Sequence, residues 1–303
     1  MLVHIGYHKT ATSFLQKRVF SQDGLFSLPW GAQSGQAVEY FVLTHSERFS
    51  PSEIRQNFID QLPDDDDTVA VISHEALSGQ PTKGRYYADR VAMRIHETFP
   101  EARIVIGIRE QKKLLASLYY QYVKMGGTDP ITKFIKTPTH RAGFRPTVRL
   151  DHFEYDLMLQ LYQRHWKRED ILVLPMEALE SDHDRYVGQL LEFAGRPEDR
   201  IAPRDAVNIR RSGVAMRMER AFNRILPPPN PRPERYRDYP LAYRLKNRTL
   251  KVLERVVPSQ TLDQIEHTKI VKHIENVVGD YFQDSNRRLA EMAGLDLKAL
   301  GYF

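Results

Sequence analysis

The stretch HIGYHKTATSFLQKRVF, from His4 to Phe20, decides the fold prediction because it joins a strand pattern to a helix pattern through a basic, hydroxyl-rich turn. Leu2–Gly6 is short and apolar, as in a buried strand, and Thr12–Phe20 has the periodicity of a helix. Backbone N–H groups at the start of a helix are unpaired, and the helix dipole is positive there. A turn of this kind can hold a phosphate or a sulfate.

Further apolar segments alternate with helical patterns along the chain. We predict three more strands, at Thr68–Ser73, Arg103–Ile108 and Ile171–Leu174. Helices are predicted at Arg85–Phe99, Gln111–Lys124 and Asp151–Trp166. Short buried strands that alternate with amphipathic helices favour an α/β fold, with a parallel β-sheet flanked by helices on both faces.

The pattern changes after the fourth predicted strand. The chain becomes helical and polar, and the proline-rich segment Pro227–Pro233 interrupts it. We therefore expect a single domain over residues 1–303, with an α/β core in residues 1–200 and a mainly helical part in residues 201–303.

Composition excludes several classes of protein. The 303 residues are 41% hydrophobic, which suffices for a sizeable core, and the chain has no cysteine. Disulfides, thiolate zinc sites and a cysteine nucleophile are therefore excluded, and a reducing compartment fits. With no signal-like start and no long apolar run, we expect a cytoplasmic protein without a transmembrane segment. The net charge of +5 suits an anionic ligand, a membrane surface or a nucleic acid equally well.

The turn itself, GYHKTATS at residues 6–13, is not a Walker A motif, because it lacks a second glycine before the lysine and is too short. It resembles the loop G-x-x-K-[ST]-[GA]-[ST]-[ST]-[FL] of the sulfotransferases that use 3'-phosphoadenosine 5'-phosphosulfate (PAPS). The matching positions are Gly6, Lys9, Thr10, Ala11, Thr12, Ser13 and Phe14. Ala11 stands where glycine is more usual, which demands more of the backbone.

A second signature of the same family is an arginine at a later strand end, followed by a serine about two helical turns on. Arg109 and Ser117 match it in IGIREQKKLLASLYYQY, although Glu110 and Gln111 replace the common Asp-Pro pair. Two further segments resemble the family, so that the resemblance covers nearly the whole chain. They are LYQRHWKREDILVLPMEAL, with Glu177 at the acidic position, and the closing DSNRRLAEMAGLDLKALGYF.

The resemblance implies a P-loop-NTPase-like sulfotransferase fold and transfer of a sulfuryl group from PAPS to an acceptor hydroxyl or amine. In that reading Lys9 is catalytic, because it stabilises charge on the sulfuryl oxygens. The loop residues Thr10, Thr12 and Ser13 would hold the 5'-phosphate, and Arg109 with Ser117 the 3'-phosphate. A late basic loop closes over the nucleotide in the family, and Arg210 and Arg211 are the matching candidates.

The base that takes the acceptor proton is open between two neighbours. His74 and Glu75 follow the second predicted strand, where the crevice at the carboxyl ends of a parallel sheet lies. Family members that act on carbohydrates commonly carry a glutamate there, which favours Glu75. His74 is the alternative, because its ordinary pKa is nearer neutrality.

Two other functions compete with this one. A P-loop phosphotransferase would need a complete Walker A motif and a Mg²⁺-binding aspartate, which the sequence lacks. A basic nucleic-acid-binding module would leave the strand-end loop without a role. We therefore expect PAPS as co-substrate, no metal and no nucleic acid partner. The acceptor is not encoded by a readable motif; a carbohydrate or glycolipid is one candidate, and the basic insertion at residues 126–149 could line its site.

Overall fold

The computed structural model describes residues 1–64, 67–135, 148–197, 199, 201, 213–225, 245, 248–249 and 260–303. The chain divides into two compact units, each assembled from separate parts of the sequence. The first unit holds Met1–Leu114, Arg149–Asp205 and Asp280–Phe303, and the second holds Leu115–Val148 and Ala206–Gly279. The expectation of a single domain over residues 1–303 stays a prediction.

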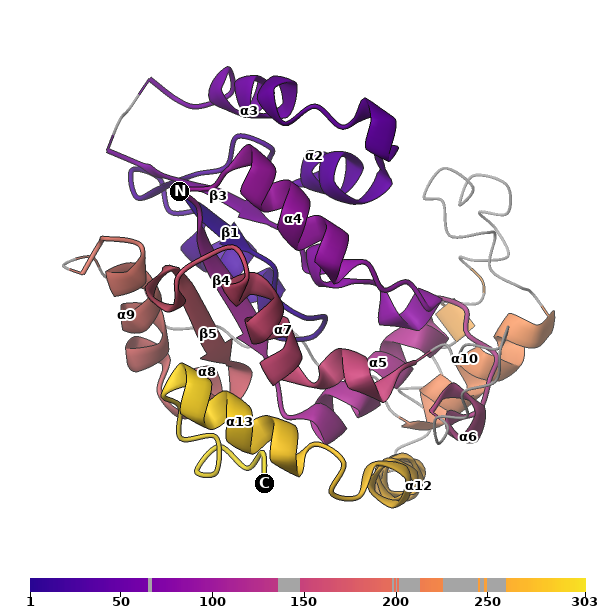
Figure 1. Ribbon diagram of the computed structural model, residues 1–303. Helices are drawn as coiled ribbons and strands as arrows, with labels where there is room; N and C mark the ends of the chain where they lie inside the picture. The colour runs from indigo at the N-terminus through magenta and orange to yellow at the C-terminus, as the bar shows by residue number, and fades with distance from the viewer. Residues whose placement is uncertain are drawn as a thin grey trace. The chain divides into compact units, whose positions relative to one another are not determined.

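The first unit is built on a five-stranded sheet with the order β2-β3-β1-β4-β5. Every neighbouring pair is parallel (Figure 1), which confirms the predicted sheet. The strands are β1 (Leu2–His4), β2 (Phe26–Ser27), β3 (Val69–Ser73), β4 (Arg103–Ile108) and β5 (Ile171–Pro175). The four predicted strands are present, and β2 is the one that the sequence pattern missed.

Strand register brings the predicted site segments to one edge of the sheet. Leu2 of β1 lies opposite Val71 of β3 and Arg103 of β4, so the carboxyl ends of these three strands are neighbours. Pairing of β1 with β4 continues beyond His4, because the N–H of Tyr7 donates to the carbonyl of Gly107 at 3.0 Å. The turn after β1 therefore starts from a position held against β4.

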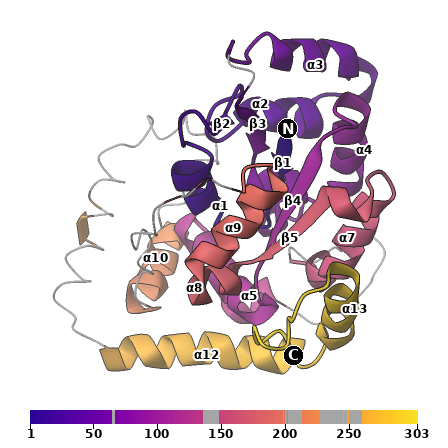
Figure 2. The same cartoon turned by 90° about the vertical axis from the view of Figure 1, so that its left-hand side faces the viewer.

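Helices cover both faces of the sheet, as predicted (Figure 2). On one side α1 (Thr12–Phe14) continues as a π-helix (Leu15–Val19), and α8 (Met176–Ser181) and α9 (His183–Phe193) lie beside β5. On the other side α4 (Ala88–Thr98) packs against α7 (Tyr155–Gln163). Successive side chains along each strand point alternately toward these two layers of helices. The apolar core of the first layer joins Leu2, Val71, Val105 and Leu174 to Phe14, Leu15, Val19, Tyr186 and Leu190.

The remaining elements complete the two units. In the first unit these are α2 (Gly35–Val38), a π-helix (Glu39–Leu43), α3 (Pro51–Ile59) and the closing α13 (Gln283–Ala293), which packs on α7. Single 3-10 turns occur at Ser46–Arg48, Glu75–Ser78, Pro81–Lys83, Leu150–Phe153 and Arg168–Asp170. Helix α5 (Gln111–Lys124) begins in the first unit and continues into the second.

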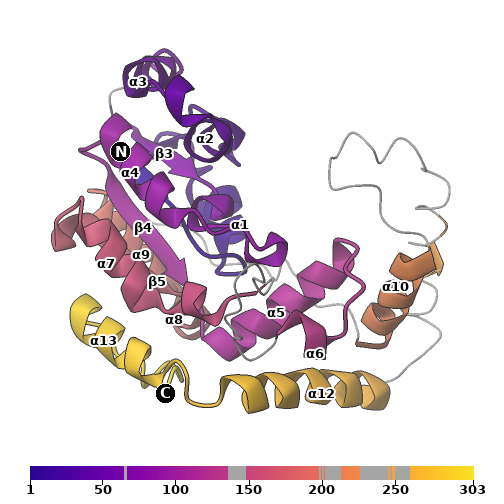
Figure 3. The same cartoon turned by 45° about the vertical axis from the view of Figure 1, so that its right-hand side comes forward.

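The second unit is helical where the structure describes it. It holds most of α5, together with α6 (Ile131–Phe134), α10 (Gly213–Ile225) and α12 (Gln260–Val278), and α12 runs along α6 and α10 (Figure 3). Helix α6 lies in the predicted insertion, of which residues 136–147 are outside the described part. Among the helices that the structure describes, none is long and apolar enough to cross a lipid bilayer.

Candidate active site

The turn after β1 has an unusual backbone. Lys9 and Ala11 have positive φ angles of 67° and 65°, while Thr10 between them does not. Alternation of this kind turns successive N–H groups toward one side and forms a concavity that binds anions. Each non-glycine residue in this region costs on the order of 1 kcal/mol, and such strain concentrates at functional sites.

The start of α1 adds further donors to the same place. Ala11 is the N-cap residue, and no side chain caps the helix. The first N–H groups of α1, at Thr12 and Ser13, are therefore left for solvent or for a ligand. A negative charge placed there also meets the positive end of the helix dipole.

Two glycines allow the loop to lie directly on the sheet. A Cβ atom on Gly6 would stand 2.5 Å from Nε2 of His4, and one on Gly107 would stand 3.0 Å from Oγ1 of Thr10. The buried Thr10 hydroxyl donates to the carbonyl of Tyr7 at 2.5 Å, which fixes the turn from inside. Sequence reasoning missed Gly107. Its signal is a lone glycine in the strand RIVIGI, where a glycine often marks the close approach of another backbone segment.

A buried polar layer supports the loop from below. Nδ1 of His4 lies 2.8 Å from Oγ of Ser73, and the amide of Gln16 donates to the carbonyl of Ser73 at 2.9 Å. The N–H of Ser73 donates to Oγ of Ser34 at 3.0 Å. Complete burial lowers the pKa of His4 to about 3, so its ring is neutral near pH 7. The ends of β1 and β3 are thus tied to the π-helix that follows α1.

The predicted nucleotide-binding residues of the loop differ in their surroundings. The side chains of Lys9 and Ser13 are exposed, and the buried Thr12 hydroxyl has no hydrogen-bond partner. The Thr10 hydroxyl is already used inside the turn. Phe14 is buried in the core, edge-on to His183, so its position in the motif is one of packing.

Arg109 reaches the loop from the end of β4. Its Nη1 lies 3.4 Å from the carbonyl of Lys9, and its own carbonyl accepts a hydrogen bond from Tyr155 at 2.6 Å. Ser117 is in the part of α5 that belongs to the second unit, so its pairing with Arg109 stays a prediction. Arg210 and Arg211 lie outside the described residues, and their role stays a prediction too.

The residues that replace the common Asp-Pro pair begin α5 in another way. The carboxylate of Glu110 accepts from the N–H groups of Lys112 at 3.0 Å and Lys113 at 2.9 Å, and so caps the helix. Glu177 is buried beside it and accepts from the N–H of Glu110 at 3.1 Å and from the hydroxyl of Tyr302 at 2.8 Å. The carboxylates of Glu110 and Glu177 therefore stabilise the start of α5, directly after Arg109.

The two candidate bases at the end of β3 are placed differently. Nδ1 of His74 accepts from the N–H of Ala76 at 2.9 Å and caps the 3-10 helix Glu75–Ser78. Burial lowers the pKa of His74, while the charge of Glu75 acts in the opposite direction. Glu75 is half-exposed, and its Oε1 lies 3.7 Å from Nε2 of His8. His8 is buried and was missed by sequence reasoning, which treated it as a variable position of the motif.

Tyr7, Tyr86 and His152 form an aromatic cluster next to His8. The hydroxyl of Tyr7 donates to the carbonyl of His152 at 2.9 Å, and the rings of Tyr86 and His152 are 5.0 Å apart. Nε2 of His152 is buried without a hydrogen-bond partner, and burial lowers the pKa of this ring to about 3. His8 and His152 are close enough to interact electrostatically. The aromatic cluster therefore contributes a second neutral histidine, His152, in addition to His4, at the carboxyl-end edge.

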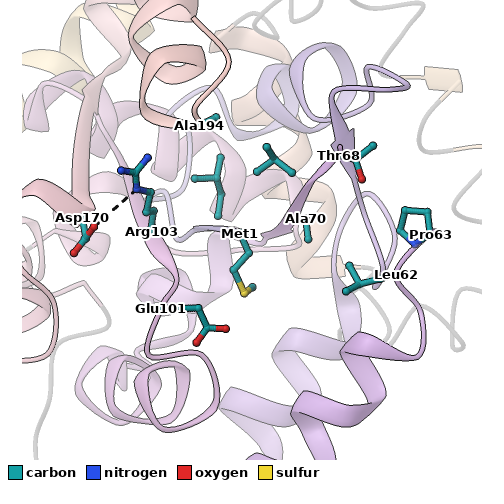
Figure 4. A pocket seen from close by; sticks show the side chains of 11 residues that line it. Met1, Leu62, Pro63, Thr68, Ala70, Glu101, Arg103, Asp170 and Ala194 are labelled. Atoms are coloured by element: carbon teal, nitrogen blue, oxygen red, sulfur yellow. Dashed lines mark ion pairs between the residues drawn. The ribbon is translucent and has the colours of Figure 1, made fainter. Parts of the chain in front are cut away.

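A cavity of about 490 Å³ lies at the opposite end of the sheet (Figure 4). It is lined by Met1, Leu2, Leu62, Pro63, Thr68, Val69, Ala70, Glu101, Arg103, Asp170 and Ala194. The strand residues among them, Leu2, Val69, Ala70 and Arg103, lie at the amino ends of β1, β3 and β4. Arg103 faces Asp170 at 3.9 Å. Ligands of open α/β sheets bind at the carboxyl ends, which places the candidate site at the Lys9 loop. In the described part of the chain, no group of three or more histidine, aspartate or glutamate side chains is arranged to hold a metal ion.

Comparison with known proteins identifies the fold. No family model and no curated sequence matches the chain. The crystal structure of a sulfotransferase from Alicyclobacillus acidocaldarius is similar, with a TM-score of 0.56 and 13% sequence identity, over 99% of this chain and 97% of that one. The chain therefore has a sulfotransferase fold, and the resemblance seen in the sequence is confirmed at the level of the fold.

Proposed function

We propose that the protein is a sulfotransferase that moves a sulfuryl group from PAPS to a hydroxyl or amine of an acceptor. One observation carries the proposal: the Lys9 loop combines a backbone nest with an uncapped helix start at the carboxyl ends of the strands. Arg109, the arginine that matches the family's second signature, lies against this loop. The shared fold is the second support.

In this proposal the two ends of the nucleotide have separate holders. The N–H groups of Ala11, Thr12 and Ser13, with the Thr12 hydroxyl, bind the 5'-phosphosulfate, and Lys9 stabilises the sulfuryl oxygens. Arg109 binds the 3'-phosphate together with Ser117, and Arg210 and Arg211 close over it. The acceptor oxygen or nitrogen forms a bond to sulfur as the bond from sulfur to the phosphate oxygen breaks. The acceptor proton passes to a base, and adenosine 3',5'-bisphosphate leaves.

Glu75 is our choice for the base. It is half-exposed, whereas Nδ1 of the neighbouring His74 is already engaged with Ala76. We expect Glu75→Gln to lower the rate of transfer by about 100-fold or more, because a glutamine cannot accept the proton. Calorimetry should give the same affinity for adenosine 3',5'-bisphosphate as in the wild type. The matched variant is His74→Gln; if that variant loses transfer and Glu75→Gln keeps it, His74 is the base.

Ligand binding separates the proposal from its competitors. We expect adenosine 3',5'-bisphosphate to bind and to raise the melting temperature, whereas ATP with Mg²⁺ and a random single-stranded oligonucleotide bind more weakly. Tighter binding of ATP with Mg²⁺ would favour a phosphotransferase, and tighter binding of the oligonucleotide a nucleic-acid-binding module. The acceptor can then be sought among glycans, lipids, phenols and peptides with a radiolabelled sulfuryl donor.

A further inference from the structure

His8 is a buried titratable group in the Lys9 loop with no assigned role. Its side chain is 9% exposed, and its Nδ1 is buried without a hydrogen-bond partner. Its other nitrogen, Nε2, faces Oε1 of Glu75 at 3.7 Å. A buried polar atom that lacks a partner is costly, by about 1–3 kcal/mol, and needs an explanation in a native structure.

The contact with Glu75 has a defined direction. If Nε2 carries the hydrogen, His8 can donate to the carboxylate of Glu75, and the unpartnered Nδ1 is an acceptor. If Nδ1 carries the hydrogen, two lone pairs face each other across the gap. The first tautomer is therefore the stable one. A separation of 3.7 Å is longer than a hydrogen bond, but catalytic hydrogen bonds often tighten when substrates bind.

Burial, together with two nearby lysines, favours the neutral form of His8. Burial is the main cause that lowers its pKa, and the charge of Glu75 raises it. Lys9 and Lys83 lower it further, and the rings of His74 and His152 are close enough to interact with it. A neutral ring with its hydrogen on Nε2 offers Glu75 a hydrogen-bond donor, and the lowered pKa makes the remaining lone pair on Nδ1 a weaker base than an ordinary histidine. Both His8 and Glu75 are attached to the edge that the sheet register fixes, at the ends of β1 and β3.

We propose that His8 is the positioning residue of the base: its Nε2–H donates to Glu75 and holds the carboxylate toward the acceptor, next to the nucleotide loop. This inference rests on the proposed function. It gives the loop two tasks, because Lys9 acts on the sulfuryl group while the preceding residue orients the group that receives the proton. No proton moves to or from His8 in this step; the acceptor proton ends on Glu75.

Spectra of histidine-labelled protein test the pair without any substrate. Long-range ¹H–¹⁵N correlation should show His8, assigned with His8→Gln, as the Nε2–H tautomer at pH 7. Its pKa should fall further in Glu75→Gln, because the carboxylate charge that raises it is removed. The Nδ1–H tautomer, or a His8 signal that Glu75→Gln leaves unchanged, would overturn the proposal.

Kinetics test the positioning role. We expect His8→Leu to lower kcat by about 10- to 100-fold with an unchanged KM for PAPS, and His8→Gln, which keeps a donor near the place of Nε2, to recover most of the loss. In a Glu75→Gln background, His8→Leu should have little further effect, since the group that it positions is gone. The control is His45→Leu, on the exposed surface, which should leave kcat unchanged.

The positioning role would be contradicted if the losses of His8→Leu and Glu75→Gln multiplied in the double variant, or if His8→Gln recovered none of the activity. Failure of the wild type to bind adenosine 3',5'-bisphosphate would instead refute the proposed function, and the spectra would still decide the His8–Glu75 contact.

Discussion

The two ends of the parallel sheet differ in how their polar groups are satisfied. At the amino ends, Arg55 pairs with Glu101 at 2.6 Å, and Arg103 donates to the carbonyl of Phe193 at 2.6 Å. None of the residues that line the cavity there, all of them described, has a buried polar side-chain atom without a partner. At the carboxyl ends four such atoms gather around the Lys9 loop. They are Nε2 of His4, Nδ1 of His8, Oγ1 of Thr12 and Nε2 of His152.

Backbone strain follows the same division. Among the described non-glycine residues, positive φ angles occur at Lys9, Ala11 and Ser34, and all three are at or beneath the carboxyl-end edge. The amino-end cavity has a volume of about 490 Å³, but none of the described residues that line it has a positive φ angle. Its charged residues Glu101, Arg103 and Asp170 are in ion pairs. Strain and unpartnered polar atoms are costs that a fold keeps only where something else requires them. Both kinds of cost occur together at the Lys9 loop and the strand ends next to it.

The largest expected effect comes from removing the loop lysine. Lys9→Ala should lower sulfuryl transfer by at least about 100- to 1,000-fold, because a positive charge is lost where negative charge develops. Transfer of radiolabelled sulfate measures it. The control is Lys17→Ala, an exposed lysine on the following π-helix, which should keep wild-type activity. Full activity of Lys9→Ala would remove the loop from the chemistry.

Strand β4 begins with Arg103 and is followed directly by Arg109, so the two arginines allow a direct comparison of the two ends of the sheet. Arg109→Ala should raise the Kd for adenosine 3',5'-bisphosphate by about 10- to 100-fold, since it removes charged hydrogen bonds to a phosphate. Arg103→Ala, at the amino end, should leave the Kd within about two-fold. Titration calorimetry on both variants gives the answer. Equal losses, or a larger loss for Arg103→Ala, would reverse the assignment of the two ends.

Acid should weaken the carboxyl-end edge through its buried histidines. The pKa of His4 is lowered to about 3 in the fold, so its stabilising effect is complete above the unfolded-state value of 6.5 and is lost as pH falls from there toward 3. Between pH 7 and 5.5 the residue should remove about 1 kcal/mol from the free energy of unfolding. Urea unfolding at both pH values measures this. His4→Gln should show a smaller pH dependence than the wild type, while the exposed-site variant His45→Gln should keep it in full; equal slopes for both variants would contradict the account.

The smallest expected effect concerns the strain at Ala11. Ala11→Gly should change the free energy of unfolding by less than about 0.5 kcal/mol, because relief of the positive φ offsets the greater freedom of glycine in the unfolded chain. The matched control, Ala290→Gly in α13, should cost about 1 kcal/mol, as in any helix interior. Denaturant titrations compare the two. A loss at Ala11 as large as that at Ala290 would mean that the loop is not strained.

The sequence predicted the parts of this edge that are local. Patterns of adjacent residues predict the loop motif, the bounds of β4 and the helix from Gln111 to Lys124. Two-residue β2 is too short to show a period, and the π-helix at Leu15–Val19 departs from the spacing that an amphipathic pattern assumes. The contacts of His8 and Gly107 were missed because their partners, Glu75 and Thr10, are distant in sequence and meet them only through the strand register.

A crystal structure with adenosine 3',5'-bisphosphate tests the central claim most directly. We predict that the 5'-phosphate lies on the N–H groups of Ala11, Thr12 and Ser13, with the Arg109 guanidinium on the 3'-phosphate. Nucleotide found in the amino-end cavity beside Arg103 and Asp170, or a Lys9 loop that stays empty at saturating concentration, would contradict it.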